Sequence, residues 1–350
     1  MIIRPAVSAD LDAVVALAKS AGVGVTTLPD SREMLAERLQ LAERSFAGRI
    51  PPEKAYYFFA LESAETGTVL GVSAIQARVG LDDVWYNYRV ANTVNAFKEM
   101  GIHRQTPTLY LTNDMTNCTE LCTLFLNPAA RSGPNGHLLS KCRMLFLAER
   151  PDLFSEKIFA EMRGYSDASG HSPFWESLGQ KFFKLDFPKA DYLTGLGNKG
   201  FIAELMPKNP IYLPFLSEEA QACVARVHDQ TGPALALLKR EGFNYNGLVD
   251  IFDAGPVIEA FLPQIRTIRE SVKRYVLVSS AEKYQDPGQV DAHDLLMVSN
   301  RHMSDFRVGL VPRNHLRDDT VILPEALAAQ LKVEGGDTVR MVDLKGGRHE

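Results

Sequence analysis

An apolar strand followed by a glycine-bearing loop is the clearest candidate for chemistry in this sequence. The run Leu121–Leu126 is apolar at nearly every position, and an amphipathic helix follows the loop. Amides at the start of such a helix have no helical acceptor and point outwards, so a pyrophosphate is their natural ligand. Gly133 and Gly136 would let the backbone approach the anion closely. The same pattern also fits an ordinary strand-to-helix connection with Pro134 at the first helical position.

The elements on either side of this loop predict a mixed α/β protein, in which helices flank a sheet. Apolar residues follow a helical spacing from Leu11 onwards, and apolar runs flank a turn at Gly67. The strands expected in the first part of the chain are Ile2–Pro5, Tyr56–Leu61, Val69–Ile75, Leu109–Leu111 and Ile158–Met162. The helices expected there are Leu11–Ala18, Arg32–Ala47, Gly136–Arg150, Phe174–Phe183, Ala220–Val227 and Ala234–Glu241.

The C-terminal end predicts a smaller, β-rich unit. Ile265–Leu277 reads as a helix that passes into a strand, and the polar stretch Ser279–Asp294, which contains Pro287, is the best linker candidate. Beyond it, strands are expected around a helix at Pro324–Leu331. We therefore expect three parts, at residues 1–200, at 201–278, where a second α/β portion completes the site, and at 279–350.

Composition narrows the classes of protein to which the chain can belong. No stretch approaches the roughly 20 apolar residues of a membrane span, and the N-terminus lacks a secretion signal, so we expect a cytoplasmic protein without membrane association. The net charge of −5 argues against a nucleic-acid binder. No second pair or nearby histidine completes a metal set with Cys118 and Cys122, so we expect no bound metal.

The segment from Leu121 to Arg143 resembles the acyl-CoA signature of the GCN5-related N-acetyltransferase superfamily. In that signature an arginine or glutamine, a middle glycine and a final glycine or alanine hold the CoA pyrophosphate. Arg131 matches the first position and Gly136 the last, whereas Pro134 replaces the middle glycine. The resemblance implies a GCN5-like mixed sheet flanked by helices, and an acyl-CoA used as co-substrate rather than a permanently bound cofactor.

Several longer strings resemble one family of that superfamily, the arginine N-succinyltransferases. They are Thr27–Pro29, Asp83–Arg89, Glu120–Leu126, Ala160–Gly164, Phe201–Lys208, His228–Thr231 and Asp250–Pro256. The family transfers succinyl from succinyl-CoA to the α-amino group of L-arginine in arginine catabolism, and some members also accept ornithine. Some members work as two related subunits. The resemblance therefore implies this activity, in a homo-oligomer or a hetero-oligomer with a paralogous subunit.

The family's functional positions fall on intact motifs of this chain. Its succinyl-CoA contact falls on Leu124, and its proton-donating histidine falls on His228 at the head of His-x-x-Thr. Without the resemblance, the sequence favours a capping or surface histidine between two helices at His228, and the family match reverses that preference. Backbone amides near Leu124 and Phe125 are expected to meet the thioester oxygen. The phosphate contacts are expected at Arg131, Gly133, Asn135 and Gly136.

The charges of the two substrates predict further binding residues. A guanidinium calls for carboxylates in fork geometry, and the free carboxylate of succinyl-CoA calls for a cation. The carboxylate candidates are Asp114, Glu120, Glu161, Asp250 and Asp253, and the cation candidates are Arg89 and Arg163. The aromatic stripe Trp85–Tyr88 fits either a pocket wall or core packing.

Two other functions stay open on the sequence alone. One is a GCN5-like N-acetyltransferase that acts on another amine, such as ornithine or a polyamine. The other is a non-catalytic CoA-sensing or DNA-binding regulator, because Val321–Met341 resembles the small swapped-hairpin barrel pieces of some DNA-binding regulators. The acidic charge of the chain favours an oligomer-building or lid-like role for that segment over DNA binding.

Overall fold

The computed structural model describes residues 1–21, 25–167, 169–195, 205–280 and 285–346. The main strands are β1 (Ile2–Pro5), β2 (Tyr56–Glu62), β3 (Val69–Gln76), β4 (Asn87–Phe97), β5 (Ile102–Thr112), β6 (Thr119–Leu126), β7 (Lys157–Glu161), β8 (Ile211–Tyr212), β9 (Asn244–Val249) and β10 (Pro256–Phe261). The helices are α1 (Leu11–Ala21), α2 (Arg32–Phe46), α3 (Asn135–Glu149), α4 (Pro173–Ser177), α5 (Gly179–Phe183), α6 (Phe187–Gly195), α8 (Glu218–Cys223), α9 (Gly232–Arg240), α10 (Arg266–Glu270) and α11 (Glu325–Leu331).

The C-terminal part is rich in short strands, as the sequence predicted. They are β11 (Val272–Ser279), β12 (Leu295–Ser299), β13 (Val308–Pro312), β14 (Leu316–Arg317), β15 (Thr320–Pro324) and β16 (Thr338–Asp343). With α11 they enclose their own apolar core. Part of the expected linker, residues 281–284, lies outside the described residues, as do residues 201–204 of a strand that the sequence predicts at Phe201–Met206.

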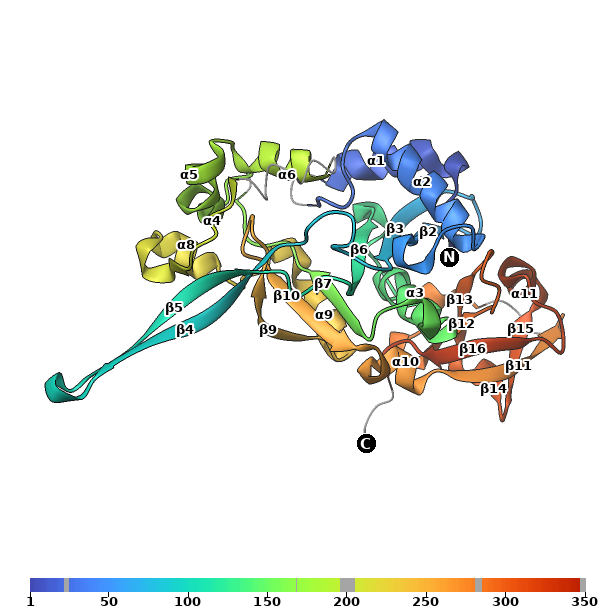
Figure 1. Cartoon of the computed structure of the whole chain (residues 1–350). Coiled ribbons are helices and arrows are strands. Elements are labelled where there is room, and N and C mark those ends of the chain that lie inside the picture. The colour runs from blue at the N-terminus through green and yellow to red at the C-terminus, as the bar shows by residue number, and fades with distance from the viewer. Residues whose placement is uncertain (22–24, 168, 196–204, 281–284, 347–350) are drawn as a thin grey trace.

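The described strands join into one sixteen-stranded mixed sheet. Its order is β14-β15-β11-β16-β12-β13-β1-β2-β3-β6-β7-β10-β9-β4-β5-β8. The C-terminal strands occupy one end, β1, β2, β3, β6 and β7 lie in the centre, and β4 and β5 leave the body towards the other end as a long ribbon (Figure 1). β6 and β7 run parallel because α3 makes the crossover between them. This mixed sheet flanked by helices is the fold class that the sequence predicted.

The two faces of the central sheet carry different helices. α3 packs on one face, where its apolar side chains meet Ile75, Leu121 and Ile158. α1 and α2 pack on the other face, against Phe58 and Cys122. Successive side chains of a strand point to opposite faces, so Leu121 and Cys122 reach different helices. The predicted strand, two helices and hairpin at the N-terminus are confirmed.

Two local predictions need correction. The single helix expected at Phe174–Phe183 is two short helices, α4 and α5, because Leu178 between them leaves the helical conformation. The strand expected at Leu109–Leu111 is one end of the much longer β5. Its partner β4 begins within the aromatic stripe and was not expected, because Asn92–Ala96 mixes small polar and apolar residues without a clear alternation.

Candidate active site

The central strands part at one point and leave a cavity between them. β6 and β7 pair only at Thr119↔Ile158 and Glu120↔Phe159, and then diverge. A cavity of about 600 Å³ lies here, and residues 120–125 and 160–163 of the two strands form its opposite walls. Residues 25–27, the loop 77–86 and residues 250–253 complete the lining. A gap between diverging strands suits an extended ligand whose reactive end must reach across the sheet.

The β6 wall of the cavity contains a β-bulge. Val72 pairs with Phe125 and Ala74 with Cys122, so Thr123 and Leu124 together oppose a single residue of β3. Thr123 has a φ of 55°, a left-handed conformation that this type of bulge normally gives to glycine. The bulge also shifts the alternation of faces, since Leu124 packs on the α3 side and Phe125 on the α1–α2 side. It therefore changes how Leu124 and Phe125 meet the cavity.

The loop after β6 has the amides that a phosphate needs. Pro134 precedes α3 and offers no side-chain cap. The first backbone hydrogen bond of the helix runs from the Leu138 amide to the Pro134 carbonyl oxygen. Within the described part of the chain, the amides of Gly133, Asn135 and Gly136 have no acceptor. Gly133 has a φ of 55°, which a side chain would strain. A Cβ atom on Gly136 would come no closer than 4.0 Å to Leu126, so the packing of the chain itself does not require glycine there.

Arg131 lies between this loop and the bulge. Its Nε donates a 3.0 Å hydrogen bond to the carbonyl oxygen of Leu126. Its guanidinium carbon lies 5.7 Å from the centre of the Phe125 ring, within range of a cation–π contact. Arg131 also lines the cavity, so its positive charge is available to an anion at the start of α3.

His228 lies beside the cavity on a turn that is tied to β7. Its backbone amide donates to the carbonyl oxygen of Arg163 at 2.9 Å, and its Nδ1 accepts the Gln230 amide at 3.2 Å. The capping bond therefore fixes the neutral tautomer with the proton on Nε2. Partial burial and the charge of Arg163 lower the pKa of His228, against the opposing charge of Asp229. Gln230 and Thr231, the next residues of the turn, are in the cavity wall.

Arg163 is an incompletely paired cation in the cavity wall. Its Nη2 donates a 3.3 Å bond to Ser166 Oγ, and its buried Nε has no hydrogen-bond partner among the described residues. Burial lowers the pKa of the guanidinium, while Asp253 and Asp191 raise it. No carboxylate of the described chain lies within 4 Å of it. An arriving carboxylate would satisfy this group.

Asp250 and Asp253 are two buried carboxyl groups at the end of β9. Asp253 accepts the amides of Gly164 at 2.7 Å and Gly255 at 2.8 Å, and Asp250 accepts those of Phe252 and Asp253. Burial raises the pKa of both groups, and the charge of Asp250 raises that of Asp253 further. Both aspartates line the cavity, but they also hold the 250–255 loop against the end of β7.

Glu120 and Glu161 line the cavity on one face of the sheet. Glu120 is paired with Phe159 across the parallel ladder, and Glu161 stands two residues beyond Phe159, so all three side chains point to the face opposite α3. Glu161 Oε1 accepts Trp85 Nε1 at 3.2 Å and Asn87 Nδ2 at 2.8 Å. The aromatic stripe thus divides between two roles. Trp85 is cavity wall, and Tyr88 is fully buried core.

Arg89 and Asp114 are not brought to the cavity. They form an ion pair with each other at the base of the ribbon, where both are partly exposed, and neither is in the cavity wall. Sequence reasoning also missed several charged lining residues, among them Arg143, which is 1% exposed and donates to the Cys122 carbonyl oxygen at 3.2 Å. The signal in the sequence was a charged residue within the buried stretch of α3, directly after Cys142.

Comparisons with known proteins identify the family of this chain. Residues 1–267 match the family described as arginine N-succinyltransferase beta subunit, and residues 279–343 match the C-terminal domain of that subunit. The chain belongs to the arginine N-succinyltransferase family. The predicted resemblance is confirmed, and membership makes the chain an acyltransferase. Within the described residues, no helix is long and apolar enough to cross a membrane.

Relatives of the family match nearly the whole chain. An arginine N-succinyltransferase subunit beta from Pseudomonas aeruginosa is 51% identical over 344 residues, which are 98% of each chain. Arginine N-succinyltransferases from Enterobacter sp. and Salmonella paratyphi B are 47% and 48% identical and also cover 98% of this chain, with 98% and 97% of their own. A solved structure, arginine/ornithine succinyltransferase subunit AI from Pseudomonas aeruginosa, has a TM-score of 0.89 at 32% identity over 99% of both chains.

Proposed function

We propose that the cavity between β6 and β7 transfers succinyl from succinyl-CoA to the α-amino group of L-arginine. The observation that carries the proposal is the distribution of charged side chains in the walls of this cavity. Arg163, which has no carboxylate within 4 Å in the described chain, lies in the same cavity as Glu120 and Glu161. A succinyl donor brings a carboxylate for the cation, and arginine brings a guanidinium for the acids.

The acyl donor would lie along β6. Its pyrophosphate would bind the amides of Gly133, Asn135 and Gly136, with Arg131 beside them, and its pantetheine arm would follow the gap towards Leu124. The amides at Leu124 and Phe125 would then face the thioester oxygen, where negative charge develops as the amine attacks. Succinyl-CoA is thus a co-substrate that enters and leaves in each cycle.

The proton balance of the reaction defines the role of His228. The neutral amine attacks the thioester carbon, the C–S bond breaks, and the net result is the transfer of one proton from nitrogen to sulfur. We assign this transfer to the protonated ring of His228, which gives a proton to the departing sulfur and regains one from the attacking amine, so that the ring is unchanged over the cycle. The Gln230 amide must leave Nδ1 while the ring is protonated. Arg163 is joined to the same turn through its carbonyl oxygen, so the proton donor and the succinyl-binding cation are held together.

Glu120 and Glu161 are our choice for the guanidinium, and Asp250 and Asp253 lie in the wall of the same cavity. Glu161 is already positioned by two N–H donors from Trp85 and Asn87. Preorganised carboxylates cost less to order when a substrate binds. The proposal makes no use of Arg89 and Asp114, which neutralise each other outside the cavity.

Release of CoA thiol tests the function directly. Purified protein should release thiol from succinyl-CoA with L-arginine, more slowly or equally with L-ornithine, and at background rate with lysine, agmatine or polyamines. Agmatine keeps the guanidinium and the amine but lacks the carboxylate, so it tests whether the site recognises the α-carboxylate of arginine. Equal turnover with acetyl-CoA would instead support a general acetyltransferase.

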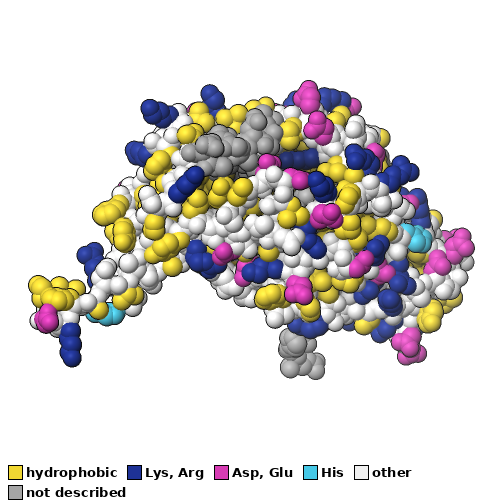
Figure 2. Space-filling model, in the orientation of Figure 1, with side chains coloured by type: hydrophobic (Ala, Val, Ile, Leu, Met, Phe, Trp, Pro, Cys, Tyr) yellow, Lys and Arg dark blue, Asp and Glu magenta, His cyan; other side chains and the backbone are white. Residues whose placement is uncertain are grey.

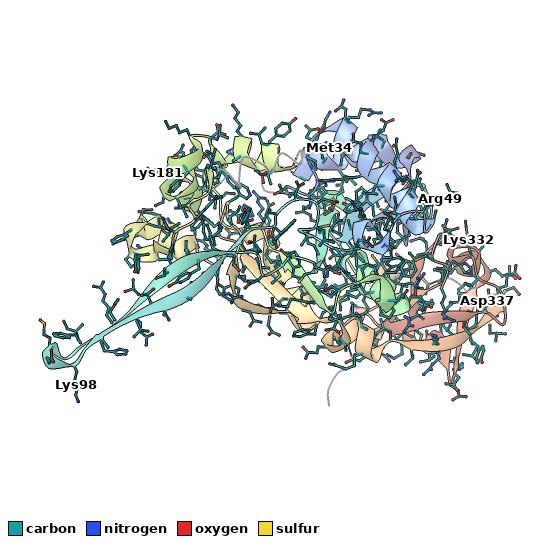
Figure 3. All side chains as sticks on the ribbon, viewed as in Figure 1. Met34, Arg49, Lys98, Lys181, Lys332 and Asp337 are labelled. Atoms are coloured by element: carbon teal, nitrogen blue, oxygen red, sulfur yellow. The ribbon has the colours of Figure 1, made fainter. Side chains whose placement is uncertain are left out.

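We propose that the ribbon of β4 and β5 joins two copies of this chain. The two strands are docked only at their base, through β9 and β8, and beyond Asn92 most of their side chains are exposed. Hydrophobic side chains gather at the tip (Figure 2), next to Lys98, which is labelled in Figure 3. Val94, Phe97, Met100 and Ile102 are between 46% and 70% exposed. A two-stranded ribbon is marginally stable alone, so a covering partner is expected.

The sequence of the ribbon favours a second copy as this partner. Val90–Phe97, the outer edge of β4, contains no charged residue and no proline, whereas β5 carries Arg104 and Pro107, residues that normally guard an edge. An unguarded edge pairs with an identical strand antiparallel about a two-fold axis, because each contact is then made twice. Sedimentation of the purified chain should show a dimer. A monomer that pairs only with a different subunit would refute the self-pairing.

A further inference from the structure

Thr123 adopts its left-handed conformation against its own preference. Threonine is branched at Cβ, and a positive φ brings its side chain against the backbone, so glycine is the usual residue at such a bulge. No glycine stands in Leu121–Leu126. Something outside the strand must therefore hold Thr123 where it is.

Three contacts hold Thr123, and two of them come from one residue. The Thr123 amide is turned out of the ladder and donates to Thr27 Oγ1 at 3.0 Å, and Thr123 Oγ1 donates to the Thr27 carbonyl oxygen at 3.1 Å. The Tyr56 hydroxyl lies 3.0 Å from the same Thr123 Oγ1. Thr27 is 96 residues away in sequence and meets both polar groups of Thr123.

Thr27 is itself fixed on the rim of the cavity. The segment Val25–Pro29 forms a tight turn, in which the Leu28 amide donates to the Val25 carbonyl oxygen at 2.8 Å. Arg38 of α2 donates to the Thr27 carbonyl oxygen, and Thr26 donates to Asp191 of α6 at 2.8 Å. The residue that holds the bulge is thus anchored to helices and not to the sheet.

The bulge determines which residues face the reacting atoms. If Thr123 returned to an extended conformation, the strand would slip by one residue, and Leu124 and Phe125 would exchange faces of the sheet. Leu124 now packs on the α3 side, and Phe125 lies on the α1–α2 side beside Arg131. A slip would move the Leu124 amide away from the thioester path proposed above.

We propose that Thr27 is a positioning residue for acyl transfer, and that its hydroxyl holds the Thr123 bulge so that the Leu124 amide faces the thioester oxygen. This role rests on the proposed function of the cavity. Thr27 does not touch the reacting atoms in this scheme. It acts through Thr123, and its loss should therefore appear in turnover and not in the binding of either substrate.

The matched pair Thr27→Val and Thr27→Ser tests the role. Valine keeps the shape and removes the hydroxyl, whereas serine keeps the hydroxyl. Removing an oxyanion donor outright costs about 100-fold or more, so loosening one should lower kcat by roughly 10-fold in Thr27→Val. The Michaelis constants should stay within about 3-fold, and Thr27→Ser should retain nearly full turnover. An unchanged kcat in Thr27→Val would overturn the proposal, as would equal losses in the valine and serine variants.

A second substitution separates positioning from general loosening of the rim. Glycine adopts a positive φ without strain, so the bulge and therefore kcat should depend less on Thr27 in the Thr123→Gly variant. Adding Thr27→Val to Thr123→Gly should cost at most about 3-fold in kcat, against roughly 10-fold in the native background. Equal losses in both backgrounds would mean that Thr27 supports the rim and not the bulge.

Hydrogen exchange keeps this test independent of the proposed activity. The Thr123 amide should exchange faster in Thr27→Val than in the native chain, because it loses its acceptor. Unchanged exchange would refute the hold on Thr123 whether or not the protein uses arginine. Native protein that releases no thiol with arginine would overturn the proposed function, whereas an active enzyme that is indifferent to Thr27→Val would overturn only the role of Thr27.

Discussion

Strand β6 and the ribbon of β4 and β5 use β-pairing in opposite ways. β4 and β5 pair without a shift from Asn87↔Thr112 to Phe97↔Ile102, although most of their length lies in solvent. β6 is mostly buried, yet its ladder with β3 breaks at Thr123. A regular ladder uses its amides within the sheet, whereas the bulge in β6 turns the Thr123 amide out to Thr27 and changes the faces of Leu124 and Phe125 in the cavity wall. We therefore assign chemistry to the irregular strand and contact with another chain to the regular one.

The largest expected effect belongs to His228, on the turn next to the splayed strands. His228→Ala should lower kcat by about 100-fold or more, the usual scale for losing a general acid, with little change in the Michaelis constant for succinyl-CoA. His228→Gln should not restore turnover, since a carboxamide side chain forms hydrogen bonds but does not gain or lose a proton near neutral pH. His103→Ala on the exposed ribbon is the matched control and should leave kcat unchanged. Retained turnover in His228→Ala would make this histidine structural.

The phosphate loop predicts the next largest effect, on binding and not on turnover. Gly136→Pro removes one amide in the first turn of α3, where proline costs the helix little. It should raise the Michaelis constant for succinyl-CoA by about 10-fold and leave that for arginine unchanged. Gly136→Ala is the control, because it keeps the amide and its Cβ atom has room. If the proline variant binds succinyl-CoA normally, the CoA phosphates do not lie at this loop.

Much of the central sheet and the cavity could be predicted from the sequence. The apolar run of β6 is the buried strand that its pattern predicts, and the loop at Gly133 lies between it and α3 as expected. The roles of this loop and of His228 stay predictions. The bulge could not be predicted, because strict alternation along Leu121–Leu126 puts Leu121 and Phe125 on one face, whereas the structure separates them. The cause is the contact of Thr27 with Thr123, which no local pattern reveals.

The charged residues show a second limit of sequence reasoning. Arg89 and Arg163 both stand in strings shared with the family, and on the sequence they are equivalent candidates. The register of the sheet separates them, since Arg89 lies at the base of the ribbon and pairs with Asp114, and Arg163 follows β7 into the cavity. Which face and which edge a strand residue occupies depends on partners far away in sequence.

That difference between the two arginines gives a smaller, more selective prediction. Arg163→Gln should lower kcat/KM for succinyl-CoA by roughly 10-fold and leave the slow reaction with acetyl-CoA unchanged, because only succinyl carries the free carboxylate. Arg89→Gln is the matched control and should leave donor preference as it is. Equal losses of kcat/KM with both donors in Arg163→Gln would show that Arg163 supports the structure of the site but does not bind the succinyl carboxylate.

The same variant has a pH readout with a definite sign. Burial and then the charge of Arg163 lower the pKa of His228, because both disfavour the protonated ring. Removing the charge in Arg163→Gln should therefore raise the pKa of His228, whereas Arg89→Gln should not move it. NMR titration of the His228 ring protons measures the change. A pKa that falls or stays constant in Arg163→Gln would place the two groups further apart than the structure shows.

The smallest effect on turnover, and the largest on assembly, is expected in the ribbon. Val94→Lys places a charge on the outer edge of β4, in the exposed part of the ribbon. It should block edge-to-edge pairing, because two paired copies would bring like charges together. Sedimentation should show a shift from dimer to monomer, while kcat stays within about 2-fold. Gln105→Lys, directly opposite on β5, is the control, since its edge already carries Arg104 and Pro107. Dissociation by both variants alike would mean that the ribbon pairs through its face, and an unchanged dimer in both would remove the ribbon from the interface.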